Sequence, residues 1–371
     1  AAAAAAAALP VGAKKDNGDR DECFEAPRQP GDRRRDHSVL RVGTLNMEWL
    51  FWRRLPPRGP FQNRTVLREH IRAMAKVVKE IDVDVLNLVE VDGCDALDLL
   101  LEDVGDDTYK PYLIKGRDSA TGQNVGLITR VDPIVDLKRT DDRVDVPADG
   151  VCVSDDCPPP DSPDVTTGVS KHYYTKIAPY NSKPIMIVSL HFIAFPTRKD
   201  RCQQRQSQAR LIQEIVQKNY RGDREELIIT GDMNDFDGDV PDVSASEPIT
   251  CALKMLKSTT RYTGAPPPTA IAANNAAPLP PTLRNVAQYA PQAKRYTAYY
   301  QPNKRICQKP PLHLSSIDHL LFSDGLYQRV HNVDFAHDLY REPCYYEQPL
   351  YSDHWPLIAV VATTNSSHAT G

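Results

Sequence analysis

The sequence of 371 residues lacks an apolar run of the roughly 18 residues that a membrane-spanning helix needs, so we expect no membrane span. It also lacks a basic excess, because 45 Lys and Arg stand against 49 Asp and Glu, for a formal net charge of -4. Binding nucleic acid mainly through a basic field needs clustered Lys and Arg, so the composition argues against that class of protein. The composition does not exclude an enzyme that meets phosphate locally through a metal ion.

No Cys-x-x-Cys pair occurs among the eight cysteines, which argues against a zinc site. The even number of cysteines suits disulfides formed in an oxidising compartment. Cys152 and Cys157 bracket a short turn and are the pair that their spacing favours. Two glycosylation sequons, at Asn63 and Asn365, point to the same compartment. We therefore expect a secreted or extracellular glycoprotein with disulfide bonds.

The chain shows no internal repeat, and its hydrophobic pattern indicates one large domain over residues 38–362. Residues 1–37 have almost no apolar periodicity, so we expect a disordered arm, in which the arginines at 33–35 form a solvated charge run. Its opening alanine run is either a signal-peptide remnant or low-complexity sequence. Residues 363–371 are expected to form a flexible tail.

Two stretches interrupt the domain. Residues 132–164 are rich in Asp and Pro and predict a loop-like insertion, whose acidity suits a rim better than a phosphate-binding surface. Residues from about 240 to 290 are rich in Ala, Pro and Asn, and we expect them to form an extended surface excursion.

Strand and helix patterns alternate along the remaining sequence, which is typical of an α/β fold. Helices are expected at residues 64–81, 95–104 and 201–220. Strands are expected at residues 39–50, 82–91, 124–130, 173–177, 184–192, 227–230, 295–300, 315–322 and 351–361.

Polar and titratable side chains recur where these strands begin or end. Each has an ordinary explanation alone: an asparagine suits a turn, a carboxylate suits a solvated strand end, and a histidine suits a hydrogen-bonded core. The set is Asn46, Glu48, Glu90, His191, Asp232, Asn234, Asp318, Asp353 and His354, with Asn124 as a further amide before a strand. Together they supply what phosphodiester hydrolysis needs, because carboxylates hold Mg²⁺ while imidazoles and amides orient water and stabilise oxyanions.

The ordered motifs resemble the exonuclease/endonuclease/phosphatase superfamily of deoxyribonuclease I-like phosphodiesterases. The resemblance extends from about residue 39 to residue 361. The motifs are Leu45-Asn46-Met47-Glu48, Leu88-Val89-Glu90, Ser189-Leu190-His191, Gly231-Asp232-Met233-Asn234, Ile317-Asp318-His319 and Ser352-Asp353-His354. The resemblance implies a four-layer α/β sandwich, with two mixed β-sheets packed face to face and helices on the outside.

The resemblance also implies a metal site that takes Mg²⁺, with Mn²⁺ or Ca²⁺ as alternatives. Glu90 is the implied principal ligand, with Glu48 and Asp353 beside it. The implied phosphate contacts are Asn46, Asn124, Asn234 and His354.

The implied proton-transfer groups come from the second half of the chain. Asp232 would orient or deprotonate the attacking water, which Asn234 would help to hold. His354 would assist proton transfer, with its tautomer fixed by Asp318 as in a catalytic triad. His191 matches the second histidine of the deoxyribonuclease branch and is the expected general acid for the leaving oxygen.

Within this superfamily, inositol-polyphosphate phosphatases usually carry the motifs Gly-Asp-Leu-Asn-Tyr-Arg and Trp-Cys-Asp-Arg. Here Asn234 is followed by Asp235-Phe236 and Asp318 by His319, so the resemblance favours a nuclease over such a phosphatase. We therefore predict a secreted, metal-dependent endonuclease that cleaves DNA, with RNA as another substrate. The alternatives are a sphingomyelinase-like or other small phosphodiesterase, for which net acidity is no handicap, and a non-catalytic binding protein on the same fold.

Overall fold

The computed structural model describes residues 21–56, 61, 63–146, 157, 158, 162, 165–258, 281–300, 313–340 and 351–363. Its first sheet has the strand order β15-β16-β1-β2-β4-β3. These strands are β1 (Val39–Leu50), β2 (Val85–Val91), β3 (Lys110–Leu113), β4 (Asn124–Thr129), β15 (Val330–Asp334) and β16 (Leu357–Ala362). β1 and β2 run parallel, and the other neighbours in this sheet run antiparallel.

The second sheet has the order β11-β14-β10-β9-β8-β5. It contains β5 (Pro133–Lys138), β8 (His172–Ile177), β9 (Ile185–His191), β10 (Glu226–Asp232), β11 (Leu283–Asn285) and β14 (Asp318–Ser323). Here β9 and β10 are the parallel pair. Two small sheets pair β6 (Val144–Asp145) with β7 (Thr166–Thr167), and β12 (Ala298–Tyr300) with β13 (His313–Ser315).

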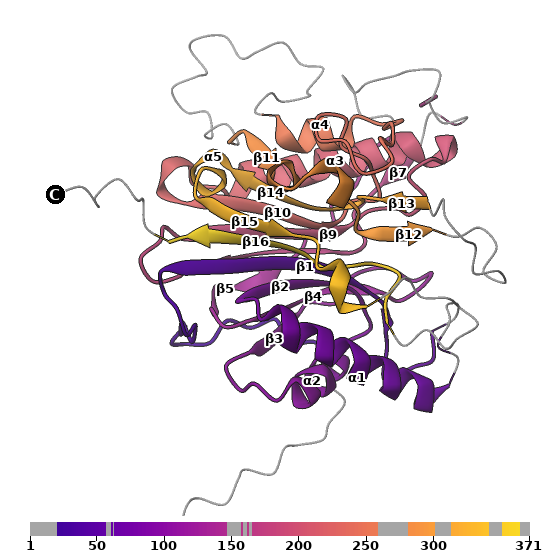
Figure 1. The fold of residues 1–371 in the computed structure, drawn as a ribbon. Helices are drawn as coiled ribbons and strands as arrows, with labels where there is room; N and C mark the ends of the chain where they lie inside the picture. Colours follow the sequence, from indigo (N-terminus) through magenta and orange to yellow (C-terminus); the bar gives the residue numbers. More distant parts are fainter. Residues whose placement is uncertain are drawn as a thin grey trace, which may run out of the picture.

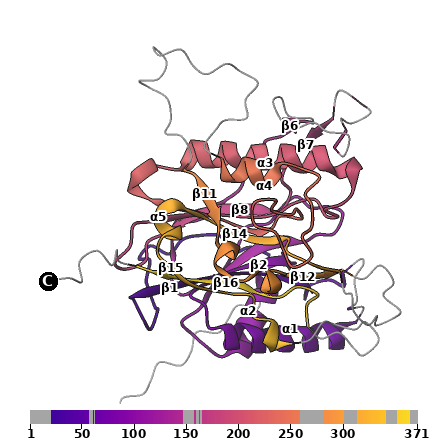
Figure 2. The same ribbon diagram turned by 45° about the horizontal axis from the view of Figure 1, so that its top comes forward.

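Helices cover the outer face of each sheet, which confirms the predicted four-layer sandwich (Figure 1). Figure 2 shows the same layers after rotation, with α1 and α2 on one side and α3 and α4 on the other. The helices are α1 (Arg64–Ile81), α2 (Cys94–Val104), α3 (Lys199–Asn219), α4 (Ala252–Lys257) and α5 (Asp324–Tyr327). No helix in the described ranges is long and apolar enough to cross a membrane.

The continuous apolar runs of the central strands follow from burial on both faces. In β10, Ile228 points into the core between the sheets, while Leu227 and Ile229 point into the core beneath α3 and α4. In β2, Val89 belongs to the core between the sheets and Leu88 to the core beneath α1 and α2.

A local signal accounts for the start of α1. The Asn63 side chain accepts a hydrogen bond from the Val66 backbone N–H at 2.9 Å and caps α1, which ends at Asp82 in a left-handed conformation. The predicted bounds of α1 and β1 are confirmed, and α2, α3 and β9 differ from prediction by one or two residues at their ends.

The expectation that the N-terminal arm is disordered up to residue 37 is wrong for residues 21–37. Cys23 forms a disulfide with Cys94 and a β-bridge with Leu113. Arg33 donates to both carboxylate oxygens of Asp132, at 2.6 and 2.7 Å, and the buried Arg34 pairs with Asp32. Only the last arginine of this run, which is 73% exposed, resembles the expected solvated charge.

Parts of both predicted interruptions form regular secondary structure. Residues 133–138 form β5 at the edge of the second sheet instead of a loop, and residues 252–257 and 283–285 form α4 and β11 inside the expected excursion. The centre of that excursion, residues 259–280, lies outside the described residues, as do residues 1–20 and 364–371.

The favoured Cys152–Cys157 disulfide is also wrong, because Cys157 pairs with Cys202 on α3. Sequence proximity suggested the first pair, whereas the fold brings together two cysteines 45 residues apart. All five described cysteines are disulfide-bonded.

Gly231 gives the first testable prediction, because its φ is +128° and an added Cβ would lie 2.0 Å from the Leu190 carbonyl oxygen. We expect Gly231→Ala to lower the free energy of unfolding by about 3 kcal/mol or more, through overpacking and backbone strain. The matched control is Gly105→Ala at the end of α2, where φ is +70° but nothing lies within 4 Å. Gly105→Ala should cost about 1 kcal/mol. Equal losses for the two variants in urea unfolding would contradict the close packing at Gly231.

Candidate active site

The two parallel strand pairs bring the predicted site residues together. The carboxyl ends of parallel neighbours lie at the same edge of a sheet, and polar groups at that edge share one site. Glu90 lies at this end of β2, and His191 and Asp232 are the last residues of β9 and β10. The antiparallel β14 begins opposite them, with Asp318 paired to Asp232.

The Asn46 side chain joins the two sheets. Its Nδ2 donates to Glu90 Oε1 at 3.2 Å and to Asp232 Oδ2 at 3.1 Å. Its Oδ1 accepts from the Glu48 backbone N–H at 3.0 Å. This amide therefore holds one carboxylate from each sheet and fixes the turn that presents Glu48.

Left-handed backbone marks the ends of the same motifs. Glu48, Trp49, Glu90 and Asn234 have φ values of 45°, 61°, 67° and 47°. Non-glycine residues rarely adopt this conformation, which costs about 1–2 kcal/mol each. The strain interrupts the register between β1 and β2 and turns the carboxylates out of the regular strand pattern. Such strain concentrates at functional sites, where the surrounding structure maintains it.

Asp232, the last residue of β10, is buried where its sheet faces Asn46 of the other sheet. Its Oδ1 accepts from the Asn234 backbone N–H at 2.9 Å, and its Oδ2 lies 3.6 Å from His191 Nε2. Burial, reinforced by the charge of Asp318, raises the pKa of Asp232 to about 7. This carboxylate therefore exchanges a proton near neutral pH.

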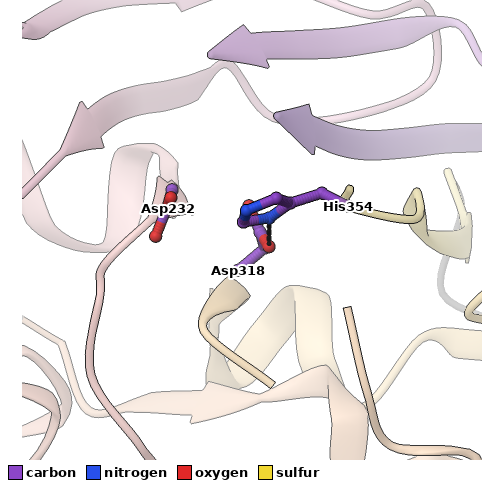
Figure 3. A group of neighbouring side chains, drawn as sticks. All are labelled: Asp232, Asp318 and His354. Atoms are coloured by element: carbon purple, nitrogen blue, oxygen red, sulfur yellow. Dashed lines mark hydrogen bonds and ion pairs between the residues drawn. The ribbon is translucent and has the colours of Figure 1, made fainter. Parts of the chain in front are cut away.

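His354 and Asp318 form the predicted imidazole–carboxylate pair. His354 Nδ1 and Asp318 Oδ2 lie 2.7 Å apart, and Figure 3 shows the carboxylate against the ring. Burial alone would lower the pKa of His354, but the charge and hydrogen bond of Asp318 outweigh it and raise the pKa well above its ordinary value. His354 is therefore an imidazolium at neutral pH, with Nε2 left to donate.

His191 has the opposite character. Burial, with the positive charges of Lys171 and His354, lowers the pKa of His191 well below its ordinary value. Its Nδ1 is buried without a hydrogen-bond partner among the described residues. His191 is therefore neutral at pH 7.

Two acidic groups of residues are candidates for holding a metal ion. The predicted ligands Glu48, Glu90 and Asp353 are neighbours: the Asp353 backbone N–H donates to Glu48 Oε2 at 3.1 Å, and the Asp353 charge adds to burial in raising the pKa of Glu90. In the described part of the chain, however, the trio whose ligand atoms all lie within 4.8 Å is Asp232, Asp318 and His354.

The chemistry of the donors favours the predicted group. His354 Nδ1 already bonds Asp318, so the compact trio is an ion pair with a neighbouring carboxylate. Glu48 and Glu90 offer the oxygen ligands that Mg²⁺ and Ca²⁺ prefer, and a cation would offset the cost of burying Glu90. The residues present therefore fit a hard divalent cation.

The Asn124 side chain bonds backbone groups through both atoms of its amide. Its Oδ1 accepts from Gly116 N at 2.7 Å, and its Nδ2 donates to the backbone carbonyls of Val91 and Asp92 at 3.2 and 3.1 Å. Asn124 thus supports the backbone that follows Glu90, and its contact with phosphate stays a prediction.

Sequence reasoning missed two cations beside the site. Lys171, directly before β8, bonds Gln123 at 3.3 Å and lies 3.8 Å from Asp118, and its charge acts on Glu90 and Asp232. Arg205 on α3 is fully buried and faces Asp235, whose pKa is raised by burial to about 6. Neither cation ends a strand, so the signal that identified the other site residues was absent.

Comparison with solved structures identifies the fold. An endonuclease/exonuclease/phosphatase protein from Bacteroides vulgatus matches with a TM-score of 0.50 and 17% identity, over 87% of this chain and 98% of the other. A mannosyl-6-phosphatase from Bacteroides thetaiotaomicron gives 0.49 and 17%, over 87% and 99%. TDP2 from Caenorhabditis elegans gives 0.47 and 14%, over 87% and 74%. No protein-family model and no curated protein matches the sequence.

The chain therefore has the endonuclease/exonuclease/phosphatase fold, which confirms the fold that the order of its motifs implied.

The Asp318–His354 pair gives the second testable prediction. We expect Asp318→Asn to lower the pKa of His354 in an NMR titration, because the carboxylate is what raises it. The raised pKa stabilises the wild-type fold fully below the unfolded value of about 6.5, and this stability is lost as pH rises through the folded pKa. Asp318→Asn should remove that loss. Asp324→Asn, at the other end of β14, is the control, and an unchanged His354 titration in Asp318→Asn would refute the pairing.

Proposed function

We propose that this chain, which has the endonuclease/exonuclease/phosphatase fold, is a secreted, metal-dependent nuclease that cleaves DNA, with RNA as another substrate. The observation that carries the proposal is the Asn46 amide, which holds Glu90 and Asp232 from separate sheets at one point. An imidazolium, His354, lies beside them. Buried carboxylates and a cation in this arrangement suit a phosphate ester and a divalent metal ion.

Glu90 and Glu48 would hold the metal ion, with Asp353 beside them. When bound, the ion would neutralise charge on the phosphate and acidify a water molecule. The structural contribution of Asn46 is to keep Glu90 within reach of Asp232.

Proton transfer falls to Asp232 and His354. With a pKa near 7, Asp232 is poised to accept a proton from the attacking water. His354 stays protonated, and its Nε2–H can donate to a phosphate oxygen or to the leaving oxygen. The resemblance implied that His191 is the general acid, but a neutral imidazole is a weak proton donor. His354 is therefore the proposed general acid. His191 is assigned a hydrogen bond to the phosphate, and Asn234 the positioning of water and phosphate.

Disulfides support the proposed extracellular location. Both Cys23–Cys94 and Cys157–Cys202 join segments far apart in sequence, and such crosslinks persist in oxidising compartments. Glycosylation at Asn63 remains a proposal, and this residue is exposed at the start of α1. Asn365 lies outside the described residues.

The third testable prediction concerns activity. Purified protein should digest plasmid DNA with Mg²⁺ or Mn²⁺ and stop when EDTA removes the metal, and Glu90→Gln should lose at least about a hundredfold in turnover. Glu80→Gln, an exposed glutamate in the last turn of α1, is the matched control and should keep full activity.

DNA, RNA and sphingomyelin liposomes are tested side by side. Liposome turnover without cleavage of either nucleic acid would replace the nuclease with a lipid phosphodiesterase. Failure on all three substrates with Mg²⁺, Mn²⁺ and Ca²⁺ would favour a non-catalytic protein on this fold.

A further inference from the structure

The loop that follows β9, residues 192–198, starts inside the candidate active site. The Phe192 backbone N–H donates to the Asp232 carbonyl at 3.0 Å, and Asn234 Nδ2 donates to the Phe192 carbonyl at 3.3 Å. The loop is therefore anchored to two residues of the site, and Phe195 follows Phe192 by three residues, at most about 11 Å of chain.

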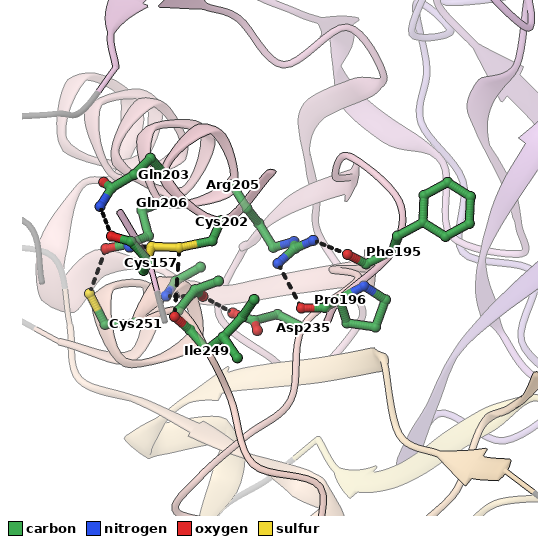
Figure 4. The surroundings of a disulfide bond; sticks show 12 residues. Cys157, Phe195, Pro196, Cys202, Gln203, Arg205, Gln206, Asp235, Ile249 and Cys251 are labelled. Atoms are coloured by element: carbon green, nitrogen blue, oxygen red, sulfur yellow. Dashed lines mark hydrogen bonds between the residues drawn. A yellow bond between two sulfur atoms is a disulfide. The ribbon is translucent and has the colours of Figure 1, made fainter. Parts of the chain in front are cut away.

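Phe195 is the unusual residue of this loop. Its backbone has φ 69°, a conformation that is strained for an aromatic residue, and its side chain is 44% exposed. Figure 4 shows the ring directed away from Arg205 and from the Cys157–Cys202 disulfide. An exposed ring contributes little to the core, so packing does not account for the strain.

A buried cation holds the loop in this shape. Arg205 donates to the carbonyls of Phe195 and Pro196 at 2.9 and 3.3 Å, as Figure 4 shows, and to that of Ile193 at 3.4 Å. Burying a guanidinium is costly unless its donors are satisfied. Backbone carbonyls of this one loop accept from both terminal nitrogens of Arg205, whereas its Nε has no partner among the described residues. A fully buried arginine therefore stabilises the loop conformation in which Phe195 is exposed.

Two further arginines surround the exposed ring. The guanidinium carbons of Arg201 and Arg198 lie 4.8 and 5.9 Å from the Phe195 ring centroid. Arg201 also donates to the Ala194 carbonyl at 3.2 Å, and Arg198 pairs with Asp200. Residues 198–205 hold four basic residues and one acidic residue, in a chain whose net charge is -4. Because Arg205 is buried, the basic residues at the surface here are Arg198, Lys199 and the partly exposed Arg201.

We propose that Phe195, Arg198 and Arg201 form a docking subsite for the nucleotide next to the scissile phosphodiester, a proposal that rests on the proposed nuclease function. A base stacks on the Phe195 ring and the adjoining guanidinium, and the flanking phosphate pairs with the arginines. The two arginines repel a choline headgroup, so the subsite selects a polynucleotide over a phosphocholine lipid.

The experiment compares Phe195→Ala with wild-type protein on an octathymidylate and on an abasic oligomer with the same backbone. We expect the ratio of kcat/KM on the thymidylate to that on the abasic oligomer to fall about tenfold, as for loss of one stacked base. Phe195→Tyr should restore the ratio. The matched control is Tyr180→Ala, an aromatic residue that is 59% exposed in the connection between β8 and β9 and should leave the ratio unchanged.

Arg201→Gln tests the phosphate contact through salt dependence. The slope of log binding constant against log salt should become shallower by about 0.7 for one lost contact to a single strand. Arg284→Ala is the control, because Arg284 also lies over an aromatic ring, Tyr327, at the far end of β14. Binding is measured in EDTA by anisotropy of a fluorescent octathymidylate, so this readout does not require turnover.

The outcomes separate this subsite from the proposed function. Wild-type cleavage with an unchanged Phe195→Ala ratio and an unchanged Arg201→Gln slope overturns the subsite and leaves the nuclease intact. Oligonucleotide binding that weakens in both variants, without cleavage by the wild type under any metal, supports the subsite and overturns the nuclease. Absence of binding and of cleavage overturns both.

Discussion

One amide, the Asn46 side chain, connects the two halves of the sandwich at the point where their chemistry meets. It donates to Glu90 in one sheet and to Asp232 in the other. Two buried carboxylates repel each other, and an uncharged amide that donates a hydrogen bond to each offsets part of this repulsion. The sheets must therefore pack in one register, and much of the surrounding geometry serves that requirement.

Local backbone features adapt to this constraint. Gly231 removes the side chain that would collide with the Leu190 carbonyl, so β9 and β10 can deliver His191 and Asp232 side by side. On the other sheet, Glu48 and Glu90 adopt strained left-handed conformations that aim their carboxylates out of the regular strands. Sheet packing, close backbone approach and local strain thus together set the positions of the same four side chains.

The charges of the site are unequally compensated. The charge of Asp318 is paired with His354 through Oδ2, whereas Glu90 and Asp232 both have raised pKa values because burial disfavours their charged forms. Lys171 supplies part of the missing positive charge. A divalent cation would supply the rest, and this electrostatic deficit is the physical reason to propose a metal site at Glu48 and Glu90.

The sequence predicted what depends on local pattern. The two-residue period identified β1, apolar spacing identified α1, and polar residues at strand ends identified Glu90, His191 and Asp232. Contacts between distant segments were not predictable this way. Cys23 pairs with Cys94 and Cys157 with Cys202 across 71 and 45 residues of sequence, and Lys171 lies near the site only in the folded chain. The position of Asn124 before a strand likewise did not indicate that its amide bonds the backbone of Gly116, Val91 and Asp92.

The most direct test of this account is to locate a bound metal ion by anomalous diffraction from crystals soaked in Mn²⁺. The account predicts one strong peak bound by carboxylate oxygens of Glu90 and Glu48, with the Asp318–His354 hydrogen bond intact. A peak bound instead by Asp232, Asp318 and His354, with that hydrogen bond broken, would contradict it.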